Sequence, residues 1–302
     1  MADTTDSKSV ARKGVRVQIP PRAPPLNRTD RTRMAFDGTA AEETFGVVGY
    51  GHFGAFLAQS LRPHARVLVA DSDTSKLPRR SRGIRAASID GMAAASVVIV
   101  AVPFSALETT LKELREVISP TTVVMDVVST KVLSTRLLLD VLDGHPNVIA
   151  SHPLFGPPSM KRIQPGQRLV VTHEQGPEAA EFRTFLETKL GLQITNLTPE
   201  QHDRAMAYMQ ALPFFIARAL VEIDILDLPN REVLSIPSFE KLANIAAIEE
   251  HHSGGMFDTS QRSNPFAGEA RETLLAVLNR IDAQIREDEP LTDPPHAHTS
   301  SH

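Results

Sequence analysis

The sequence predicts an α/β fold, in which an N-terminal Rossmann domain with a doubly wound, mainly parallel sheet precedes an all-helical C-terminal dimerisation domain. Three observations lead to this fold. Short runs of β-branched residues alternate with helix-length amphipathic segments, a pattern typical of βαβ units. The first run leads into a glycine-rich loop, and no further run occurs after about Leu197. The expected strands cover residues 45–48, 67–70, 97–102, 123–127, 148–150 and 169–172.

The domain boundaries follow from the same pattern. Residues 44–197 form the predicted Rossmann domain and residues 198–287 the helical domain, which begins where Thr198 can cap a helix and Pro199 can occupy its first position. The remaining segments, residues 1–43 and 288–302, lack apolar periodicity and are predicted to be disordered tails. The basic first segment is also compatible with an organellar transit peptide, and Met34 is a candidate for the true start.

Composition excludes several classes of protein. The chain of 302 residues carries a net charge of −4 without a clustered basic run, so nucleic acid is not an expected partner. It contains no cysteine, which rules out disulfides and thiolate metal sites and fits a reducing compartment. No apolar run reaches the roughly 20 residues that cross a bilayer. We therefore expect a cytoplasmic protein that acts on a small molecule and contacts no membrane.

The glycine-rich loop after the first predicted strand is the clearest candidate for a cofactor site. In this pattern Gly49 permits a tight turn, Gly51 lets the backbone approach a pyrophosphate, and Gly54 lets the helix pack closely on the strand. Free N–H groups at the start of the following helix bind the anion. The spacing predicts a dinucleotide site, and the alternative is a strand-to-helix turn without a ligand. The predicted cofactor-binding residues of the loop are Gly49, Tyr50, Gly51, His52, Phe53 and Gly54.

An acidic residue at the end of the second predicted strand favours NAD as the cofactor. Asp71 stands where a carboxylate hydrogen-bonds the ribose hydroxyls of NAD and repels the 2′-phosphate of NADP. Val102 and Pro103 stand at the end of the next strand, where the backbone should pass beneath the nicotinamide ribose, although Pro103 is equally explained as a strand terminator. Nearby cations leave NADP open as an alternative, namely Lys76, Arg79 and Arg80.

Polar side chains follow two further predicted strands. Ser129 and Lys131 come after the strand at 123–127, and Ser151 and His152 come after the strand at 148–150. Because the carboxyl ends of parallel strands form one edge of a sheet, these side chains are expected beside the nicotinamide. An imidazole can take a hydroxyl proton, a hydroxyl can orient the imidazole, and a cation favours an anionic substrate. The residues predict an alcohol dehydrogenation, with a structural turn histidine as the alternative for His152.

Five segments in fixed order extend this prediction to a family. They are residues 49–54, 126–131 (Asp-Val-Val-Ser-Thr-Lys), 151–157 (Ser-His-Pro-Leu-Phe-Gly-Pro), 201–204 (Gln-His-Asp-Arg) and 210–213 (Gln-Ala-Leu-Pro). In these segments the chain resembles the prephenate and arogenate dehydrogenases of tyrosine biosynthesis, over about residues 45–278. The resemblance implies oxidative decarboxylation of a cyclohexadienyl acid, with hydride passing from ring C4 to NAD. It implies that His152 takes the C4-hydroxyl proton, that Ser129 orients His152, and that Lys131 helps electrostatically.

The resemblance also implies substrate contacts, and the sequence departs from it at two of them. Phe214 stands where the family usually has a histidine, and no arginine occurs near residues 239–244, where the family binds the ring carboxylate. A buried carboxylate needs a cation, and Lys241, Arg262 or Arg218 are candidates. His202 is explained equally well by substrate binding and by a helix cap or domain contact. The predicted substrate-binding residues are Ser151, His202, Gln210, Phe214 and Lys241.

The helical half predicts a homodimer and no metal. It carries so many apolar residues in fewer than one hundred positions that a second copy is the expected partner. Adjacent His251 and His252 would point in different directions on a helix, and the histidines of the last residues lie in a predicted tail, so neither group forms a metal cage.

Two other functions are compatible with the sequence. The altered positions Phe214 and Asn244 would suit a dehydrogenase that acts on an amino-substituted prephenate analogue in secondary metabolism. Loss of two substrate contacts would also suit a non-catalytic NAD-binding module. The joint presence of Ser129 and His152 favours an enzyme, because a protein without catalysis has no need of that pair.

Overall fold

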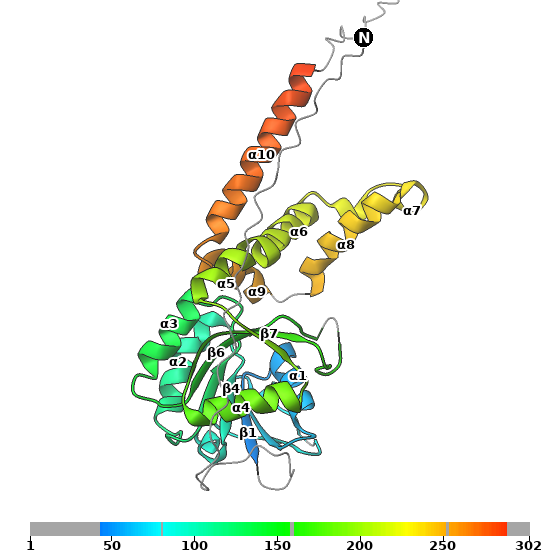
Figure 1. Cartoon of the computed structure of the whole chain (residues 1–302). Helices are drawn as coiled ribbons and strands as arrows, with labels where there is room; N and C mark the ends of the chain where they lie inside the picture. The colour runs from blue at the N-terminus through cyan, green and yellow to red at the C-terminus, as the bar shows by residue number, and fades with distance from the viewer. Residues whose placement is uncertain (1–42, 80, 158–159, 252–253, 289–302) are drawn as a thin grey trace, which may run out of the picture. The chain divides into compact units, whose positions relative to one another are not determined.

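The computed structural model describes residues 43–79, 81–157, 160–251 and 254–288. Within these residues one sheet of eight strands has the order β3-β2-β1-β4-β5-β6-β7-β8 (Figure 1). Neighbouring strands run parallel except β6 and β7, so the predicted doubly wound, mainly parallel sheet is confirmed. The strands are β1 (Thr44–Val48), β2 (Arg66–Ala70), β3 (Ile84–Ala86), β4 (Val97–Val100), β5 (Val123–Asp126), β6 (Val148–Pro153), β7 (Arg168–Gln175) and β8 (Gln193–Asn196).

Helices connect the strands and make up the described chain after β8. The α-helices are α1 (His52–Leu61), α2 (Phe104–Arg115), α3 (Val132–Val141), α4 (Pro177–Thr188), α5 (Pro199–Met206), α6 (Leu212–Glu222), α7 (Arg231–Leu234), α8 (Pro237–His251), α9 (Gly254–Asp258) and α10 (Ala267–Asp288). Shorter turns of helix are η1 (Thr74–Lys76), η2 (Asp90–Ala94) and η4 (Ile225–Asp227), together with two π-helical turns, η3 (Ala207–Ala211) and η5 (Thr259–Ser263). The predicted helical C-terminal region is therefore confirmed.

The sheet has a buried core on each face, because successive side chains of a strand point to opposite sides. On one face, Phe45 and Val47 of β1 pack in the same cluster as Leu57 of α1 and Phe182 of α4. On the other face, Val48 packs in a cluster that contains residues of α2 and α3. Helices therefore cover both faces of the sheet. The loops at the ends of the strands are left uncovered and can carry a site.

Several strands differ from the sequence prediction. Strands β3 and β8 were not predicted, because both are short and have only partial burial. Strand β6 continues past residue 150 to Pro153, since the antiparallel strand β7 pairs His152 with Val170 beyond a register shift at Ala150 and Ser151. Such irregularities redirect side chains and are frequent beside active sites. His152 therefore belongs to the strand itself and not to the loop after it.

The start of the helical region agrees with the predicted cap. Thr198 Oγ1 accepts the Gln201 N–H at 3.2 Å, Gln201 Oε1 accepts the Thr198 N–H at 3.0 Å, and Pro199 is the first residue of α5. The division into two domains near residue 197 stays a prediction. Of the predicted tails (residues 1–43 and 288–302), all residues except Glu43 and Asp288 lie outside the described residues, and so do the candidate start at Met34, Arg80 and His252. Asp288 is the last residue of α10. None of the described helices is both long and apolar enough to cross a membrane.

Candidate active site

The glycine-rich loop follows β1 and leads into α1, as predicted. Gly49 has a φ of +95°, which side chains rarely adopt, and its N–H donates to the Ala70 carbonyl at 2.8 Å. A Cβ on Gly54 would lie 1.8 Å from the Gly49 carbonyl oxygen, so packing requires glycine there. A Cβ on Gly51 would meet nothing within 4 Å. Gly51 therefore leaves open space at the start of α1, where helix N–H groups can bind a phosphate.

The two alanine substitutions at Gly54 and Gly51 form a matched pair. Gly54→Ala should destabilise the fold by about 1–3 kcal/mol or more, because helix and loop backbones must separate. Gly51→Ala should leave stability almost unchanged and weaken dinucleotide binding by about tenfold or more, since a methyl group occupies the ligand's side of the loop. Urea unfolding and NADH fluorescence titration measure the two effects. Equal dinucleotide affinity in Gly51→Ala and the parent protein would contradict a cofactor at this loop.

Asp71 follows β2 and holds the glycine-rich loop in place. Its Oδ2 accepts the Tyr50 N–H at 2.7 Å, and its Oδ1 accepts the Asp73 N–H at 2.8 Å. The Nζ of Lys76 lies 3.8 Å from Oδ1. A carboxylate oxygen can accept more than one hydrogen bond, so Asp71 retains capacity for ribose hydroxyls. The carboxylate thus links the loop to the position where the adenosine ribose is expected.

The remaining residues expected around the cofactor lie in the same loops. His52 is exposed at the start of α1, and Phe53 is half-buried in its first turn. Val102 and Pro103 lie between β4 and α2, and Pro103 directly precedes the first residue of the helix. Arg79 is exposed. Contact of these residues with a dinucleotide stays a prediction.

A buried ion pair lies at the carboxyl ends of β5 and β6. Lys131 Nζ is 2.9 and 2.7 Å from the two oxygens of Asp126 and 2.7 Å from the Ser151 carbonyl oxygen, which accounts for its three donors. The Ser151 N–H donates to the Asp126 carboxylate at 3.2 Å, and Ser151 Oγ donates to the Asp126 carbonyl at 2.7 Å. Burial lowers the pKa of the Lys131 ammonium, and Asp126 opposes this effect. Lys131 and Ser151 therefore tie β5 to β6 directly before His152, with no donor of Lys131 left for a substrate.

Next to this ion pair, two buried histidines and a carboxylate form a hydrogen-bonded chain. Nδ1 of His152 lies 2.9 Å from Nε2 of His202, and Nδ1 of His202 lies 2.7 Å from Oδ1 of Asp203. Asp203 also accepts the backbone N–H groups of Lys131 at 2.7 Å and Val132 at 2.8 Å. The carboxylate therefore caps the N-terminus of α3, where the helix dipole favours a negative charge.

The environment of His152 favours its neutral form. Burial, His202 and the Lys131 ammonium, in that order, hold the pKa of His152 well below its usual value of 6.5. Among the described residues Nε2 of His152 forms no hydrogen bond, although the side chain is nearly buried. The hydrogen bond expected from Ser129 to His152 is absent from the described contacts. Ser129 is half-buried in the loop after β5. His202, and not Ser129, contacts His152, because α5 packs against α3 and β7 and brings His202 to it.

The other residues expected at the substrate lie on the helices after α5. Gln210 is half-buried in the π-helical turn η3, and Phe214 is buried in α6. Each candidate cation has its own setting: Lys241 is exposed on α8, Arg262 pairs with Asp258 at 3.1 Å, and Arg218 lies over the Phe257 ring at 4.4 Å. The described contacts do not bring these cations to His152, so their roles stay predictions.

Sequence reasoning did not find the structural roles of two acids. Asp126 appears in the motif at 126–131, and Asp203 in the motif at 201–204, but neither was assigned a role at the site. A helix cap was one explanation for the position of His202. The neighbouring Asp203 does cap a helix, but it caps α3 and not α5, the helix to which it belongs. An acid that bonds a distant backbone leaves no local pattern in sequence. The order of the motifs is the available signal.

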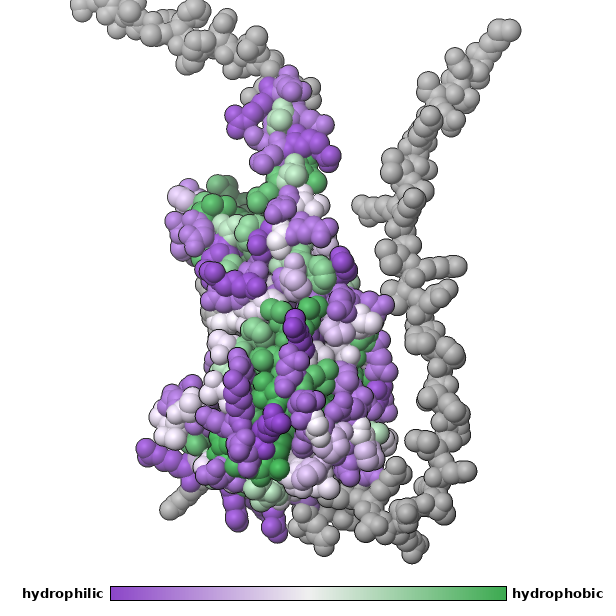
Figure 2. Space-filling view, turned by 90° about the vertical axis from the view of Figure 1, so that its left-hand side faces the viewer, coloured by the Kyte–Doolittle hydropathy of each residue, from purple (hydrophilic) through white to green (hydrophobic). Residues whose placement is uncertain are grey.

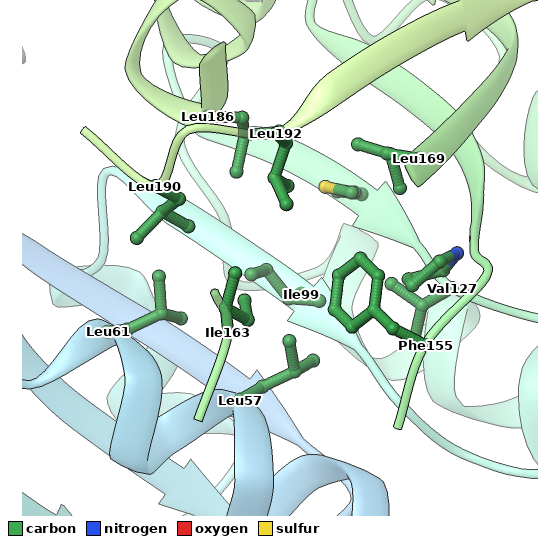
Figure 3. A pocket seen from close by; sticks show the side chains of 12 residues that line it. Leu57, Leu61, Ile99, Val127, Phe155, Ile163, Leu169, Leu186, Leu190 and Leu192 are labelled. Atoms are coloured by element: carbon green, nitrogen blue, oxygen red, sulfur yellow. The ribbon is translucent and has the colours of Figure 1, made fainter. Parts of the chain in front are cut away.

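A hollow beneath the sheet has a different character from this site. It lies between α1, α4 and the ends of β4, β5 and β7, and apolar side chains such as Leu57, Ile99 and Leu186 line it (Figure 3). Polar ligand groups would lose their hydrogen bonds to water there without gaining partners. The hollow is therefore a gap in the packing of the core, and the chemistry belongs to the polar chain at His152.

The chemistry available at the sheet edge is proton transfer beside a dinucleotide loop. A neutral imidazole with an unbonded Nε2 can accept a proton, and the glycine-rich loop can hold a pyrophosphate. No group of histidine and acidic side chains in the described part of the chain has the arrangement of a metal site. The loop and His152 thus bring a site that fits a dinucleotide and a side chain that can accept a proton to the same edge of the sheet.

Comparisons with known proteins relate the chain to a family of dehydrogenases. The family described as "Prephenate dehydrogenase, nucleotide-binding domain" matches residues 57–216, more than half of the chain. A probable arogenate/prephenate dehydrogenase of Methanocaldococcus jannaschii is 25% identical over 209 residues, which cover 66% of this chain and 46% of that protein. Arogenate dehydrogenase 1, chloroplastic, of Arabidopsis thaliana is 25% identical over 249 residues, 78% of this chain and 37% of that protein. The chain thus matches less than half the length of each of these relatives.

Solved structures share the fold. Prephenate dehydrogenase from A. aeolicus, in complex with hydroxyphenyl propionate and NAD+, superimposes with a TM-score of 0.67 at 19% identity, covering 83% of this chain and 93% of that one. Synechocystis arogenate dehydrogenase gives a TM-score of 0.61 at 22% identity, covering 81% and 92%. At these identities the likeness concerns the fold of the sheet and the helices that follow it.

Proposed function

Because the chain belongs to the prephenate dehydrogenase family, and carries its nucleotide-binding domain, we propose that it oxidatively decarboxylates prephenate, or its amino counterpart arogenate, in tyrosine biosynthesis. The observation that carries this proposal is the buried His152, whose Nε2 bonds to no described residue at the edge of the sheet that bears the glycine-rich loop. Two relatives with 25% identity are named as a probable arogenate/prephenate dehydrogenase and as an arogenate dehydrogenase.

NAD is the cofactor that we propose for the loop. The room left by Gly51 fits a pyrophosphate, and the Asp71 carboxylate fits ribose hydroxyls better than it fits a 2′-phosphate. When bound, NAD supplies the acceptor for the hydride from ring C4. Among the described residues, Lys76 is the cation that contacts Asp71. A preference for NADP would require the attraction of Lys76 for the 2′-phosphate to exceed the repulsion by the Asp71 carboxylate.

In the proposed reaction His152 acts as the base. The hydride leaves C4 as the C4-hydroxyl proton passes to His152 Nε2, which makes C4 a carbonyl carbon. The ring carboxylate leaves as CO2, its bonding electrons enter the ring, and the resulting phenolate oxygen takes a proton back from His152. The ring becomes aromatic, which supplies the driving force. The protein therefore has to hold the substrate in place and take one proton. Ser129 lies in the loop after β5 and remains a candidate for contact with the substrate hydroxyl.

The test of this proposal is the appearance of NADH, followed by absorbance. Purified full chain is offered prephenate and arogenate in turn, first with NAD and then with NADP. Turnover of either acid with NAD supports the proposal. If both acids are inert and an amino-substituted prephenate analogue reacts, the chain is a dehydrogenase of secondary metabolism. Tight NAD binding without turnover of any of them would identify a non-catalytic NAD-binding module.

We also propose that the chain works as a cytoplasmic homodimer formed through its helical region. Apart from Leu133 and Leu154, every large apolar side chain that is exposed in the described chain lies between residues 208 and 285. Figure 2 shows apolar (green) and hydrophilic (purple) side chains intermixed on the face turned to the viewer. Four of the exposed apolar side chains recur along one stripe of α10: Leu275, Leu278, Ile281 and Ile285. This spacing is typical of a helix that packs against another helix.

Leu278→Glu should convert the dimer to monomers, because the interface would have to bury a carboxylate without a partner. Gln284→Glu is the control, since it adds the same charge to the same helix at a hydrophilic, exposed position. Light scattering coupled to gel filtration measures the mass in both variants. A parent protein that elutes with the mass of one chain at micromolar concentration would refute the dimer.

A further inference from the structure

The hydrogen-bonded chain behind His152 fixes where its proton lies. Both oxygens of Asp203 accept backbone N–H groups, at 2.7 Å from Lys131 and 2.8 Å from Val132. Each of these two N–H groups at the start of α3 needs an Asp203 oxygen that accepts. An ionised carboxylate meets this need, because it can only accept hydrogen bonds. Asp203 therefore accepts from His202, and the proton of that 2.7 Å contact lies on His202 Nδ1.

The same reasoning extends from His202 to His152. A neutral imidazole carries one N–H, so His202 with its proton on Nδ1 has an Nε2 that can only accept. The His152 Nδ1 lies 2.9 Å from this Nε2 and must then donate to it. A neutral His152 with its proton on Nδ1 has an Nε2 without a proton. This is the nitrogen that forms no hydrogen bond with the described residues.

From this order of donors we propose that His202 is a positioning residue, which Asp203 holds so that the proton of His152 stays on Nδ1 and Nε2 faces the reaction as the acceptor. The inference rests on the proposed function, in which His152 is the base. When the substrate hydroxyl proton reaches Nε2, His152 becomes an imidazolium. Its Nδ1–H still donates to His202, and the Asp203 carboxylate lies at the far end of the chain to balance the new charge.

Burial of all three side chains supports a positioning role. His202 and Asp203 are fully buried. Asn264, in the segment before α10, donates from Nδ2 to the Asp203 carbonyl at 2.8 Å and so helps to hold α5 in place. The two imidazole rings meet nearly edge to face, at 77°. A side chain that is enclosed in this way has a fixed ring orientation and little access to a substrate. This is the reason to separate His202 from the substrate-binding residues.

The experiment reads the tautomer directly and needs no substrate. Long-range ¹H–¹⁵N NMR spectra of histidine-labelled full chain distinguish a protonated ring nitrogen from a bare one, and a His152→Asn sample identifies the His152 signals. We expect the proton of His152 on Nδ1 at neutral pH. His202→Leu removes the acceptor and should move the proton partly or wholly to Nε2. The reverse arrangement, in which doubly protonated His202 donates to His152 Nδ1, would place the proton on Nε2 in the parent protein and overturn the proposal.

Kinetics of two variants supply the second readout. His202→Leu should lower kcat by about 10- to 100-fold with little change in the KM for NAD, as losing an orienting partner does elsewhere. His202→Gln can place its Oε1 near the former Nε2 and accept from His152, so it should recover most of the activity. An unchanged kcat in His202→Leu would overturn the positioning role. If no variant, including the parent, turns over any of the acids while His152 carries its proton on Nδ1, the proposed function fails and the assigned tautomer stands.

The pH profile of kcat/KM supplies a further test, because a purely structural role of His202 would not shift it. The groups that face His152 are His202 and the Lys131 ammonium, with Asp203 behind His202 and Asp126 paired to Lys131. Loss of the His202 acceptor changes the cost of protonating His152, so the acidic limb of kcat/KM should shift in His202→Leu. It should stay near the parent position in His202→Gln. Identical acidic limbs in the parent and in His202→Leu would contradict the proposal.

Discussion

His152→Asn should lower kcat by about 10²- to 10⁴-fold, the range by which a positioned base accelerates proton transfer. Asparagine is close in size and polar, so it should disturb the buried chain less than an apolar residue. Its amide cannot accept and hold a proton at neutral pH, and the step that releases the hydride then has no base. NAD affinity should change little, because the glycine-rich loop and Asp71 are untouched. The rate is measured from the absorbance of NADH as it forms, with prephenate and with arogenate as substrates.

His145→Asn is the matched control for this substitution. His145 lies before β6, at the opposite end of that strand from His152, and its Nε2 lies 2.7 Å from the Thr122 carbonyl oxygen. The same chemical change there should leave kcat within about twofold, because surroundings away from the reacting atoms contribute little to the rate. Comparable losses of kcat in both variants would mean that His152 acts through stability and not as the base.

The pH dependence follows from the same environment. Burial and its two cationic or ionisable neighbours hold the pKa of His152 well below 6.5 in the folded protein, so the neutral base persists as the pH falls through that value. The acidic limb of kcat/KM should therefore lie below pH 6.5. Protonation is easier in the unfolded chain, so His152 makes stability fall as the pH drops from 6.5 through the folded pKa. Urea unfolding at pH 8 and pH 5.5 should show a smaller difference for His152→Asn than for the parent protein.

The sequence predicted the sheet well and the interior of the site less well, for a physical reason. Runs such as residues 97–100 and 123–125 are buried on both faces, and their continuous apolar character identifies them. Strand β8 is mostly exposed and pairs only with β7, so tertiary contact decides its structure and composition does not. The glycine-rich loop could be predicted because local backbone geometry requires glycine at Gly49 and Gly54.

The partner of His152 could not be read in the same way. His202 lies 50 residues further along the chain, and nothing in the spacing favours it over Ser129, which lies closer in sequence. The choice depends on how α5 packs against α3 and β7, and the cap that Asp203 makes on α3 is one contact of that packing. Long-range polar contacts of this kind are fixed by the whole fold, and motif order can indicate that a residue matters without indicating what it touches.

Lys131→Met should lower the free energy of unfolding by about 3–5 kcal/mol, because it leaves the Asp126 carboxylate buried without its partner. The two charged side chains are fully buried, and the ammonium makes three hydrogen bonds, so no water can replace it without opening the site. Lys112→Met removes an exposed partner from Glu108 on α2 and should have little effect. Urea unfolding followed by circular dichroism measures all three proteins. Equal stability of Lys131→Met and the parent would show that the buried pair contributes nothing.

The double variant Asp126→Asn with Lys131→Met separates stability from catalysis. Removing both charges avoids the unpaired carboxylate, so the double variant should be more stable than Lys131→Met alone. Asparagine can still accept the Ser151 N–H, which preserves the link between β5 and β6. If Lys131 acts only by holding that link, the folded double variant should keep most of its kcat and its KM for the acid. A large rise in that KM, in a protein that is stable and binds NAD normally, would instead show that Lys131 binds the substrate as its cation.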